Sequence, residues 1–398
     1  MSNRIVGRAE RSHRGEPVND LSDSTLPANF PAAISQSPQR LLIAASGTGG
    51  HVFPAIAVAE QLPEYQIEWL GVPDRMETRL VPTHYPRHTI SVEGFQQRLG
   101  PGTLGVLLKF VRSIWQVRHL LQQGQFQGVF TTGGYIAAPA AIAARSLGLP
   151  VVLHESNAIP GKVTRWLSPW CSVVAIGFNA AATHLPRTKT VCVGTPVRAQ
   201  FFSPPAIDLP IPPDVPLLAI VGGSQGAVAV NKLVRQCAPA WLEAGIWIVH
   251  QTGDNDPDAQ SLQHPHYLSL PFYDNMAGLL HRANLVVSRA GAGTLTELAI
   301  AQTPSILIPF PFAAEDHQTY NAKVFADAGA ARLFQQADLT PETITAEVLH
   351  LLKDQTALEQ MAQQTAQLAV PDSADRLAKL IRQVLLSQAD RNESASVR

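Results

Sequence analysis

The chain has 398 residues, 45% of them hydrophobic and 15% charged, a composition that suits a soluble globular protein with ample buried surface. This length exceeds one ordinary core and favours two α/β domains. The formal net charge is −1, and no dense Lys/Arg run with interleaved aromatic residues occurs, so nucleic acid is not an expected partner.

Strand and helix patterns alternate from residue 40 onward. Residues 1–39 hold too little apolar surface to offset the entropy of ordering, so we predict a disordered leader. The apolar run at 40–46 is typical of a buried parallel strand. The loop Gly47-Thr-Gly-Gly50 and a helix from Val52 to Leu62 follow it, with Pro54 in the first helical turn. Further strands are predicted at 67–70, 128–131, 151–153, 173–176 and 190–193, with helices at 104–122 and 135–147.

A proline-rich segment divides the chain. Six prolines fall within residues 199–216, which predicts an interdomain linker. The strand, glycine loop and helix pattern then returns at 217–221, Gly222-Gly-Ser-Gln-Gly226 and 227–242. Later strands are predicted at 246–250, 285–288 and 305–309, and a helical pattern covers 341–386. We therefore predict two Rossmann-like domains, at 40–198 and 217–370, followed by a C-terminal helix at 371–388 and a frayed tail at 389–398.

Both glycine loops are predicted to face a diphosphate. Each opens a helix whose unpaired N–H groups and positive dipole end favour an anion. Neither is a P-loop, because no Lys-Ser/Thr pair follows, and the first lacks the third glycine of a dinucleotide fingerprint. His51 stands beside the first loop, where a neutral imidazole can take a proton from a sugar hydroxyl. The alternative is a histidine that only shapes the loop.

Polar clusters follow several other predicted strands, at the ends where ligands gather in open α/β sheets. In the second domain, Glu297 can accept hydrogen bonds from ribose hydroxyls, but the spacing from Thr294 to Glu297 also fits a capping box. The clusters are Gly133-Gly-Tyr135, His154-Glu-Ser-Asn157, Gly194-Thr-Pro-Val-Arg198, the segment 288–297 and Glu315-Asp-His-Gln-Thr-Tyr-Asn321.

Together and in this order, these motifs resemble those of the MurG family, over residues 41 to 385. The resemblance implies the GT-B fold, in which two Rossmann-like domains face each other across a cleft. It implies an inverting glycosyltransferase that moves N-acetylglucosamine from UDP-N-acetylglucosamine (UDP-GlcNAc) to undecaprenyl-pyrophosphoryl-N-acetylmuramyl-pentapeptide, with no metal or other cofactor. The enzyme would work peripherally on the cytoplasmic side of the bacterial plasma membrane.

The resemblance also implies roles for individual residues. Four residues match family positions that act on the acceptor side or support a loop: His51, Tyr135, Glu155 and Asn231. Of these, His51, Tyr135 and Glu155 are the catalytic candidates. Serine at position 156 departs from the glutamine that is frequent in the family, and the leader is not part of the family core. The implied donor-binding residues are Thr48, Gly49, Gly50, Asn157, Arg198, Ser224, the backbone at Tyr273, Ala292, Gly293, Thr294, Leu295, Thr296, Glu297 and Gln318.

Residues 107–118 offer a predicted contact with an anionic membrane surface. Phe110, Ile114 and Trp115 stand among Lys109, Arg112 and Arg118, and apolar and basic residues together can rest on an anionic leaflet. Residues 41–198 carry 13 Lys or Arg against 7 Asp or Glu, whereas residues 199–398 carry 12 against 20, which agrees with an anionic partner. The alternatives are an ordinary core-facing helix and a chance distribution of surface charge. Trp166, Leu167 and Trp170 would extend the contact.

Two other functions remain open at this point. An epimerase of the same fold would act on UDP-GlcNAc alone, with extra acid/base carboxylates beside the sugar and no acceptor site. A non-catalytic nucleotide-sugar binding module would show no turnover with a lipid acceptor.

Overall fold

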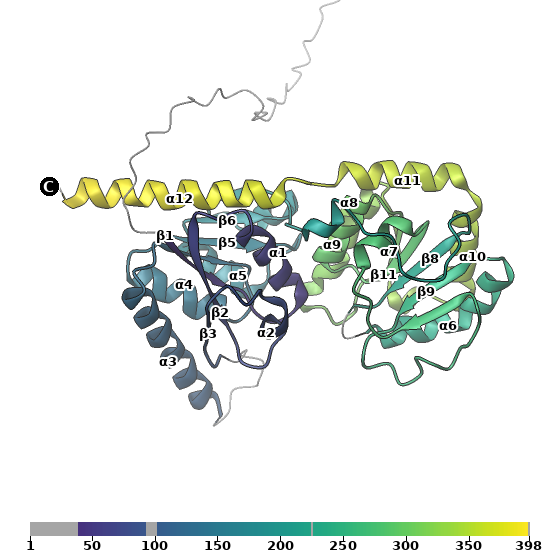
Figure 1. The fold of residues 1–398 in the computed structure, drawn as a ribbon, viewed down its shortest axis with the longest axis horizontal. Coiled ribbons are helices and arrows are strands. Elements are labelled where there is room, and N and C mark those ends of the chain that lie inside the picture. The colour runs from purple at the N-terminus through teal and green to yellow at the C-terminus, as the bar shows by residue number, and fades with distance from the viewer. Residues whose placement is uncertain (1–38, 93–101, 224–225, 397–398) are drawn as a thin grey trace, which may run out of the picture. The chain divides into compact units, whose positions relative to one another are not determined.

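The computed structural model describes residues 39–92, 102–223 and 226–396. The predicted leader lies outside these residues, apart from Gln39. Two parallel sheets, each covered by helices on both faces, make up the described part of the chain (Figure 1). This confirms the predicted pair of Rossmann-like domains.

The first sheet has the strand order β3-β2-β1-β4-β5-β6-β7, and all its strands run parallel. β1 lies inside the sheet. β2 and β3 follow on one side of it, and β4 to β7 follow on the other side. The strands are β1 (Gln39–Ala44), β2 (Tyr65–Gly71), β3 (Arg87–Thr89), β4 (Gly128–Thr131), β5 (Val151–Glu155), β6 (Val173–Ile176) and β7 (Thr190–Cys192).

Helices cover this sheet because its strands carry apolar side chains on both faces. One buried cluster joins the sheet to α3 and α4, and a second joins it to α1 and the C-terminal helix. The elements are α1 (Gly49–Ala59), α2 (Glu77–Leu80), α3 (Gly102–Gln123), α4 (Ala137–Ser146), α5 (Lys162–Leu167) and the 3-10 helices η1 (Ser168–Trp170), η2 (Asn179–His184) and η3 (Ala199–Phe201).

The second sheet repeats the plan with the parallel order β10-β9-β8-β11-β12-β13. Its strands are β8 (Leu217–Val221), β9 (Trp247–Gln251), β10 (Tyr267–Leu270), β11 (Leu285–Ser288), β12 (Ser305–Leu307) and β13 (Ala331–Leu333). Its helices are α6 (Val228–Glu243), α7 (Met276–Arg282), α8 (Ala292–Ala301), α9 (His317–Asp327), α10 (Pro341–Lys353) and α11 (Gln355–Gln367), with η4 (Ala314–Asp316) and η5 (Gln336–Asp338).

Three strands that the sequence does not predict are all edge strands. β3, β10 and β13 each end a sheet and are three or four residues long. Their residues are largely exposed or half-buried, because an edge strand lacks a neighbour on one side. Without a continuous apolar run, the pattern that reveals the central strands is missing.

The first helix begins earlier than predicted. α1 starts at Gly49, directly after its N-cap Thr48, so Pro54 is the sixth helical residue and not part of the first turn. A proline there has no N–H for the carbonyl of Gly50, the residue four positions before it. The predicted start at Val52 is therefore wrong, because helical turns at glycine carry no apolar signal.

The C-terminal helical pattern is three helices. The last, α12 (Ser373–Ser396), returns to the first domain and buries Leu377, Ile381 and Leu385 in the same cluster as α1 (Figure 1, yellow). The helix continues to Ser396, beyond the predicted end of the C-terminal helix at residue 388. In its last turns, Arg391 and Ser394 donate side-chain hydrogen bonds to the carbonyls of Ser387 and Asp390 one turn earlier.

Candidate active site

The glycine loops lie where the strand order of each sheet reverses. β1 and β4 are neighbours in the first sheet, and β8 and β11 in the second, although neither pair is consecutive in the chain. Open α/β sheets bind ligands at this point, beyond the carboxyl ends of the strands. A Cβ atom placed on Gly293 in α8 would lie 3.9 Å from the Cα atom of Gly50 in α1. The first turns of α1 and α8 therefore meet across the two domains.

His51 lies in the first turn of α1, beside the loop that follows β4. Its Nδ1 atom is 2.7 Å from the carbonyl oxygen of Thr132, and the Thr132 hydroxyl donates to the carbonyl of His51 at 3.0 Å. Because a carbonyl oxygen only accepts, Nδ1 carries the proton and Nε2 of the neutral ring keeps a lone pair. The imidazole is thus held in the tautomer that a proton acceptor at Nε2 requires.

The turn after β4 brings further predicted residues to His51. Gly133 and Gly134 have φ angles of +92° and +74°, a backbone region that favours glycine, and Cβ atoms there would lie 3.7 and 3.9 Å from the imidazole. Tyr135 follows directly and is 46% exposed. Thr48 and Gly49 come shortly before His51 in the chain, as the N-cap and the first residue of α1.

Glu155 ends β5 and organises the loop that follows it. Its Oε1 atom accepts from the backbone N–H and the side-chain amide of Asn157, at 3.0 and 2.9 Å. Its Oε2 atom accepts from the N–H of Gly161 at 3.2 Å and the hydroxyl of Thr164 at 2.7 Å. The carboxylate is buried and shapes the loop at 155–164. Both oxygens thus stabilise the loop, and the role of Glu155 on the catalytic or acceptor side stays a prediction.

The neighbouring His154 is also structural. It is fully buried, and its Nε2 atom lies 2.9 Å from the carbonyl oxygen of Gly194. Burial lowers the pKa of this imidazole below its ordinary value, because a charged ring would be cut off from water. A neutral His154 therefore joins the end of β5 to the segment that leads to Arg198.

Asn321 on α9 joins the two domains. Its side-chain oxygen accepts from the N–H of Ala158 at 2.8 Å, and its amide donates to Asn157 Oδ1 at 3.1 Å and to the carbonyl of Ala290 at 3.2 Å. Both ends of this amide are engaged, so Asn321 connects the loop after β5 with the segment between β11 and α8. Glu315, from the same predicted cluster, pairs with Lys162 and Arg165 of α5 at 3.2 and 2.6 Å.

Arg198 and Glu297 also meet across the domains. Arg198 donates to Glu297 Oε1 at 3.0 Å, and its guanidinium lies 4.3 Å from the centre of the Phe53 ring. Burial raises the pKa of the Glu297 carboxyl, while the charge and hydrogen bond of Arg198 act in the opposite direction. The buried Nε atom of Arg198 has no partner among the described residues, which leaves a donor for a ligand beside the carboxylate.

The first turns of α8 exclude the capping-box alternative. The N-cap of α8 is Gly291, without a side-chain cap, so Thr294 is the third helical residue and Glu297 the sixth. Leu295 is fully buried in the core of the second domain, and Thr296 donates to the carbonyl of Ala292 at 2.9 Å. The helical period turns the Leu295 side chain to the core, so a donor contact at this position would involve its backbone.

Gln318 and Tyr273 act on nearby backbone. Gln318 accepts from the N–H groups of Ala290 and Phe310 at 3.2 and 2.9 Å. Tyr273 is buried and donates its hydroxyl to Asp208 in the proline-rich segment at 2.5 Å. Burial, and then the Asp208 carboxylate, raise the pKa of this phenol to about 12. The phenol therefore ties the proline-rich segment to the second domain.

Comparison with known families identifies the two domains. The N-terminal domain model of glycosyltransferase family 28 matches residues 41–176, and the C-terminal domain model matches residues 217–377. The chain belongs to glycosyltransferase family 28. The predicted GT-B fold is thereby confirmed, because each half of the family 28 fold coincides with one of the two sheets.

Relatives in family 28 carry a specific name. The chain is 64% identical over 352 residues to the UDP-N-acetylglucosamine–N-acetylmuramyl-(pentapeptide) pyrophosphoryl-undecaprenol N-acetylglucosamine transferase of Nostoc sp., covering 88% of this chain and 99% of that protein. It is 62% identical over 352 residues to the protein of the same name from Trichodesmium erythraeum, covering 88% and 94%. It resembles the crystal structure of Acinetobacter baumannii MurG with a TM-score of 0.70 and 33% identity, covering 87% and 100%.

The second glycine loop of this family 28 chain is described in part. Ser224 lies outside the described residues. Asn231, at the start of α6, is fully buried and donates to the Thr252 carbonyl at 2.8 Å and to Asp256 at 2.7 Å. Its oxygen lies 3.0 Å from Nε2 of His250, an imidazole whose pKa is lowered to about 3, mainly by burial. Asn231 therefore joins the start of α6 to the segment that follows β9.

The exposed face of α3 differs from the one predicted. Phe110 and Ile114 pack against the core of the first domain. Leu107, Val111 and Trp115 follow at intervals of four residues, are 48%, 43% and 68% exposed, and share one stripe of the helix. Lys109 and Arg112 are exposed beside them. The predicted pair Phe110 and Ile114 is thus half-buried against the core, and the exposed apolar surface of the helix is the neighbouring stripe.

The tryptophans of the neighbouring segment divide in the same way. Trp166 and Trp170 are 55% and 46% exposed, with ring centres 5.7 Å apart, whereas Leu167 is fully buried and cannot extend a surface contact. Within the described ranges, no helix is long and apolar enough to cross a bilayer.

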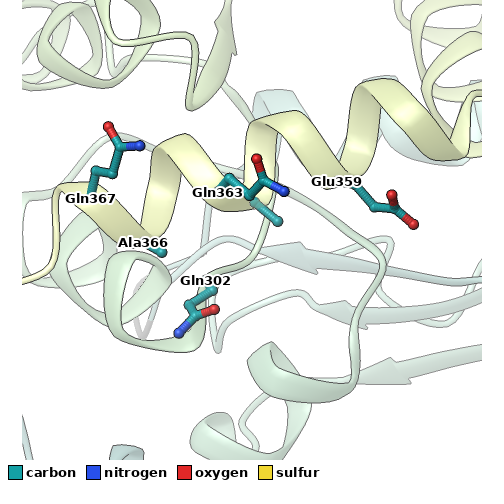
Figure 2. A pocket seen from close by; sticks show the side chains of 6 residues that line it. Gln302, Glu359, Gln363, Ala366 and Gln367 are labelled. Atoms are coloured by element: carbon teal, nitrogen blue, oxygen red, sulfur yellow. The ribbon is translucent and has the colours of Figure 1, made fainter.

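A hollow elsewhere on the second domain is separate from these loops. It lies between the end of α8 and α11, where Figure 2 shows side-chain amides and one carboxylate around it. Its lining is Gln302, Glu359, Ala362, Gln363, Ala366 and Gln367. No residue predicted for the site lines it. In the described part of the chain, no group of three or more His, Cys, Asp or Glu side chains could hold a metal ion.

Sequence reasoning missed two residues of the site, Thr132 and Phe53. Thr132 fixes the imidazole of His51, and Phe53 stacks on Arg198. Thr132 had a local signal, since it directly follows the buried strand β4 and precedes two glycines. Phe53 had none, because its partner is far away in the chain. Asn321 belongs to a predicted polar cluster, but its place between the domains had no local signal.

Proposed function

We propose that this chain transfers N-acetylglucosamine from UDP-GlcNAc to the C4 hydroxyl of a lipid-linked N-acetylmuramyl-pentapeptide. The names of its family 28 relatives, at 62% and 64% identity over nearly their whole length, support this reaction. Those names also favour a transferase over an epimerase. The observation in the structure that carries the proposal is the His51 imidazole, oriented by the Thr132 carbonyl beside the meeting point of α1 and α8.

The reaction is a direct displacement. The C4 hydroxyl oxygen of the acceptor attacks the anomeric carbon of the donor, and the bond from that carbon to the diphosphate oxygen breaks. His51 Nε2 takes the hydroxyl proton, and the electron pair of the broken bond leaves with uridine diphosphate. N–H groups in the first turn of α8 face the charge that develops there. A single attack from the opposite side inverts the anomeric centre.

In this proposal the nucleotide lies mainly against the second domain, the acceptor lies against the first, and residues of both meet the transferred sugar. Arg198, Glu297, Gln318 and the start of α8 hold the nucleotide sugar, with Ser224, Thr294 and the backbone at Tyr273 completing its contacts. Thr48, Gly49, Gly50 and Asn157 lie beside the transferred sugar. Tyr135 stands on the acceptor side, where its exposed ring follows the glycine turn. These assignments rest on the resemblance together with the contacts described above.

The acceptor carries a polyprenyl tail, so the enzyme works at a membrane. We propose that the exposed stripe of α3 rests on anionic lipid, with Lys109 and Arg112 facing the headgroups. Trp166 and Trp170 provide a second apolar contact. This places the enzyme peripherally on the cytoplasmic side of the bacterial plasma membrane, where the nucleotide sugar is available.

Release of uridine diphosphate tests the function. Purified protein should release it when UDP-GlcNAc and a lipid-linked muramyl-pentapeptide are both present, and a His51→Asn variant should lose most of this activity. With the donor alone, interconversion of the sugar would reveal an epimerase. Donor binding without release in the presence of the acceptor would indicate a binding module. Either of these results would overturn the proposal.

A further inference from the structure

Glu77 is a buried carboxylate that the mechanism above does not use. It begins α2 and is 2% exposed. Its Oε1 atom accepts from the Ser46 hydroxyl at 2.5 Å and from the N–H of Val72 at 2.8 Å. Its Oε2 atom accepts from the N–H of Gly47 at 3.2 Å. One side chain therefore joins the segments that follow β1 and β2.

The segment after β1 leads straight into the first turn of α1. Gly47 has a φ angle of +105°, which glycine adopts readily. Because glycine can also adopt many other backbone conformations, fixing this one costs more conformational entropy than at other residues. An external contact is therefore needed to select one conformation, and Glu77 provides it. The approach is close, since a Cβ atom on Gly71 would lie 3.0 Å from Cγ of Glu77.

We infer that Glu77 is a positioning residue: it fixes the first glycine loop and, through it, the place of the His51 imidazole relative to the acceptor hydroxyl. This inference rests on the proposed function. Both carboxylate oxygens accept from backbone N–H groups, which can only donate. In Glu77→Gln, an amide NH2 group would face one of these two N–H donors. Even this substitution, which keeps the shape of the side chain, would therefore release the loop.

The rate of transfer should therefore depend on Glu77 more than donor binding does. A misplacement of about 1 Å costs on the order of 100-fold in rate, so we expect Glu77→Gln to lower kcat by about 10- to 100-fold. The dissociation constant for UDP-GlcNAc, measured calorimetrically without acceptor, should stay within about twofold, because the donor contacts lie mainly in the second domain.

Glu68 provides a matched control. It is a buried glutamate of the same domain, and its partners are Arg40 at the amino end of β1 and His88. Glu68→Gln removes a buried carboxylate without touching the glycine loop, so it should leave kcat within about twofold of the wild type. Wild-type kcat in Glu77→Gln would overturn the inference, and so would an equal loss of kcat in Glu68→Gln.

Hydrogen exchange gives a second test that does not depend on turnover. Glu77→Gln should speed amide exchange in peptides that cover residues 46–52, and Glu68→Gln should not. Ser46→Ala, which removes one hydrogen bond to Glu77, should act in the same direction and replaces Glu77→Gln if that variant does not fold. If the wild type releases no uridine diphosphate, the proposed function fails. Unchanged exchange at 46–52 instead removes the role of Glu77.

Discussion

Replacing Arg198 by methionine should leave the Glu297 carboxylate largely buried without its cation. The two side chains are 24% and 18% exposed, and 3.0 Å separates the guanidinium nitrogen from the carboxylate oxygen. A hydrogen bond to a charged group contributes about 1.5–3 kcal/mol, and methionine keeps the apolar stem beside Phe53. We expect the free energy of unfolding to fall by about 2 kcal/mol at neutral pH.

The loss should depend on pH with a defined sign. Burial raises the pKa of Glu297, and Arg198 opposes that rise, so removing Arg198 raises the pKa further. A carboxyl group whose pKa is raised on folding destabilises the folded state only when it is ionised. Below the unfolded value of about 4.3, both states hold the proton and the deficit is small. The deficit in the free energy of unfolding grows as the pH rises through the raised pKa of Glu297 in the folded state.

Denaturant unfolding at about pH 4 and about pH 7.5 measures the deficit. The double variant Arg198→Met with Glu297→Gln serves as the control. It should recover much of the loss at the higher pH, since the neutral amide leaves no charge to bury. A deficit of the same size at both pH values, or no recovery in the double variant, would refute an uncompensated carboxylate as its cause.

Three further predictions concern other residues. His51→Asn should lower kcat by about 100-fold or more with donor affinity retained, measured by release of uridine diphosphate; wild-type kcat would rule out His51 as the base. Trp115→Glu should abolish sedimentation with anionic vesicles at low salt without changing the melting temperature, whereas Phe110→Ala, a core contact, should lower stability by about 2 kcal/mol; vesicle binding by Trp115→Glu equal to the wild type would contradict this. Asn321→Ala should cost about 2–3 kcal/mol, because it leaves buried partners unsatisfied. Glu315→Gln, whose partners include the largely exposed Lys162, should leave the melting temperature unchanged, and equal thermal shifts in these two variants would count against the bridge at Asn321.

The central strands and the loops after them could be predicted from the sequence because their signals are local. A parallel strand covered by helices on both faces appears as a continuous apolar run, as at β1, β4, β8 and β11. Glycine and a polar residue then follow at the strand end. His51 and the start of α8 are therefore predictable from the strand and the glycine loop that precede each of them in the sequence.

Contacts between distant segments were decided only by the tertiary structure. The proton on the His51 imidazole is placed by Thr132, 81 residues away, and Asn157 meets Asn321 across 164 residues. Whether Phe110 or Val111 faces the sheet depends on how α3 packs, and α12 finds its partner in the first domain. Local periodicity fixes what an element is and which face is apolar. Which surfaces then meet depends on the free energy of the whole packed chain, and this cannot be predicted from a short segment alone.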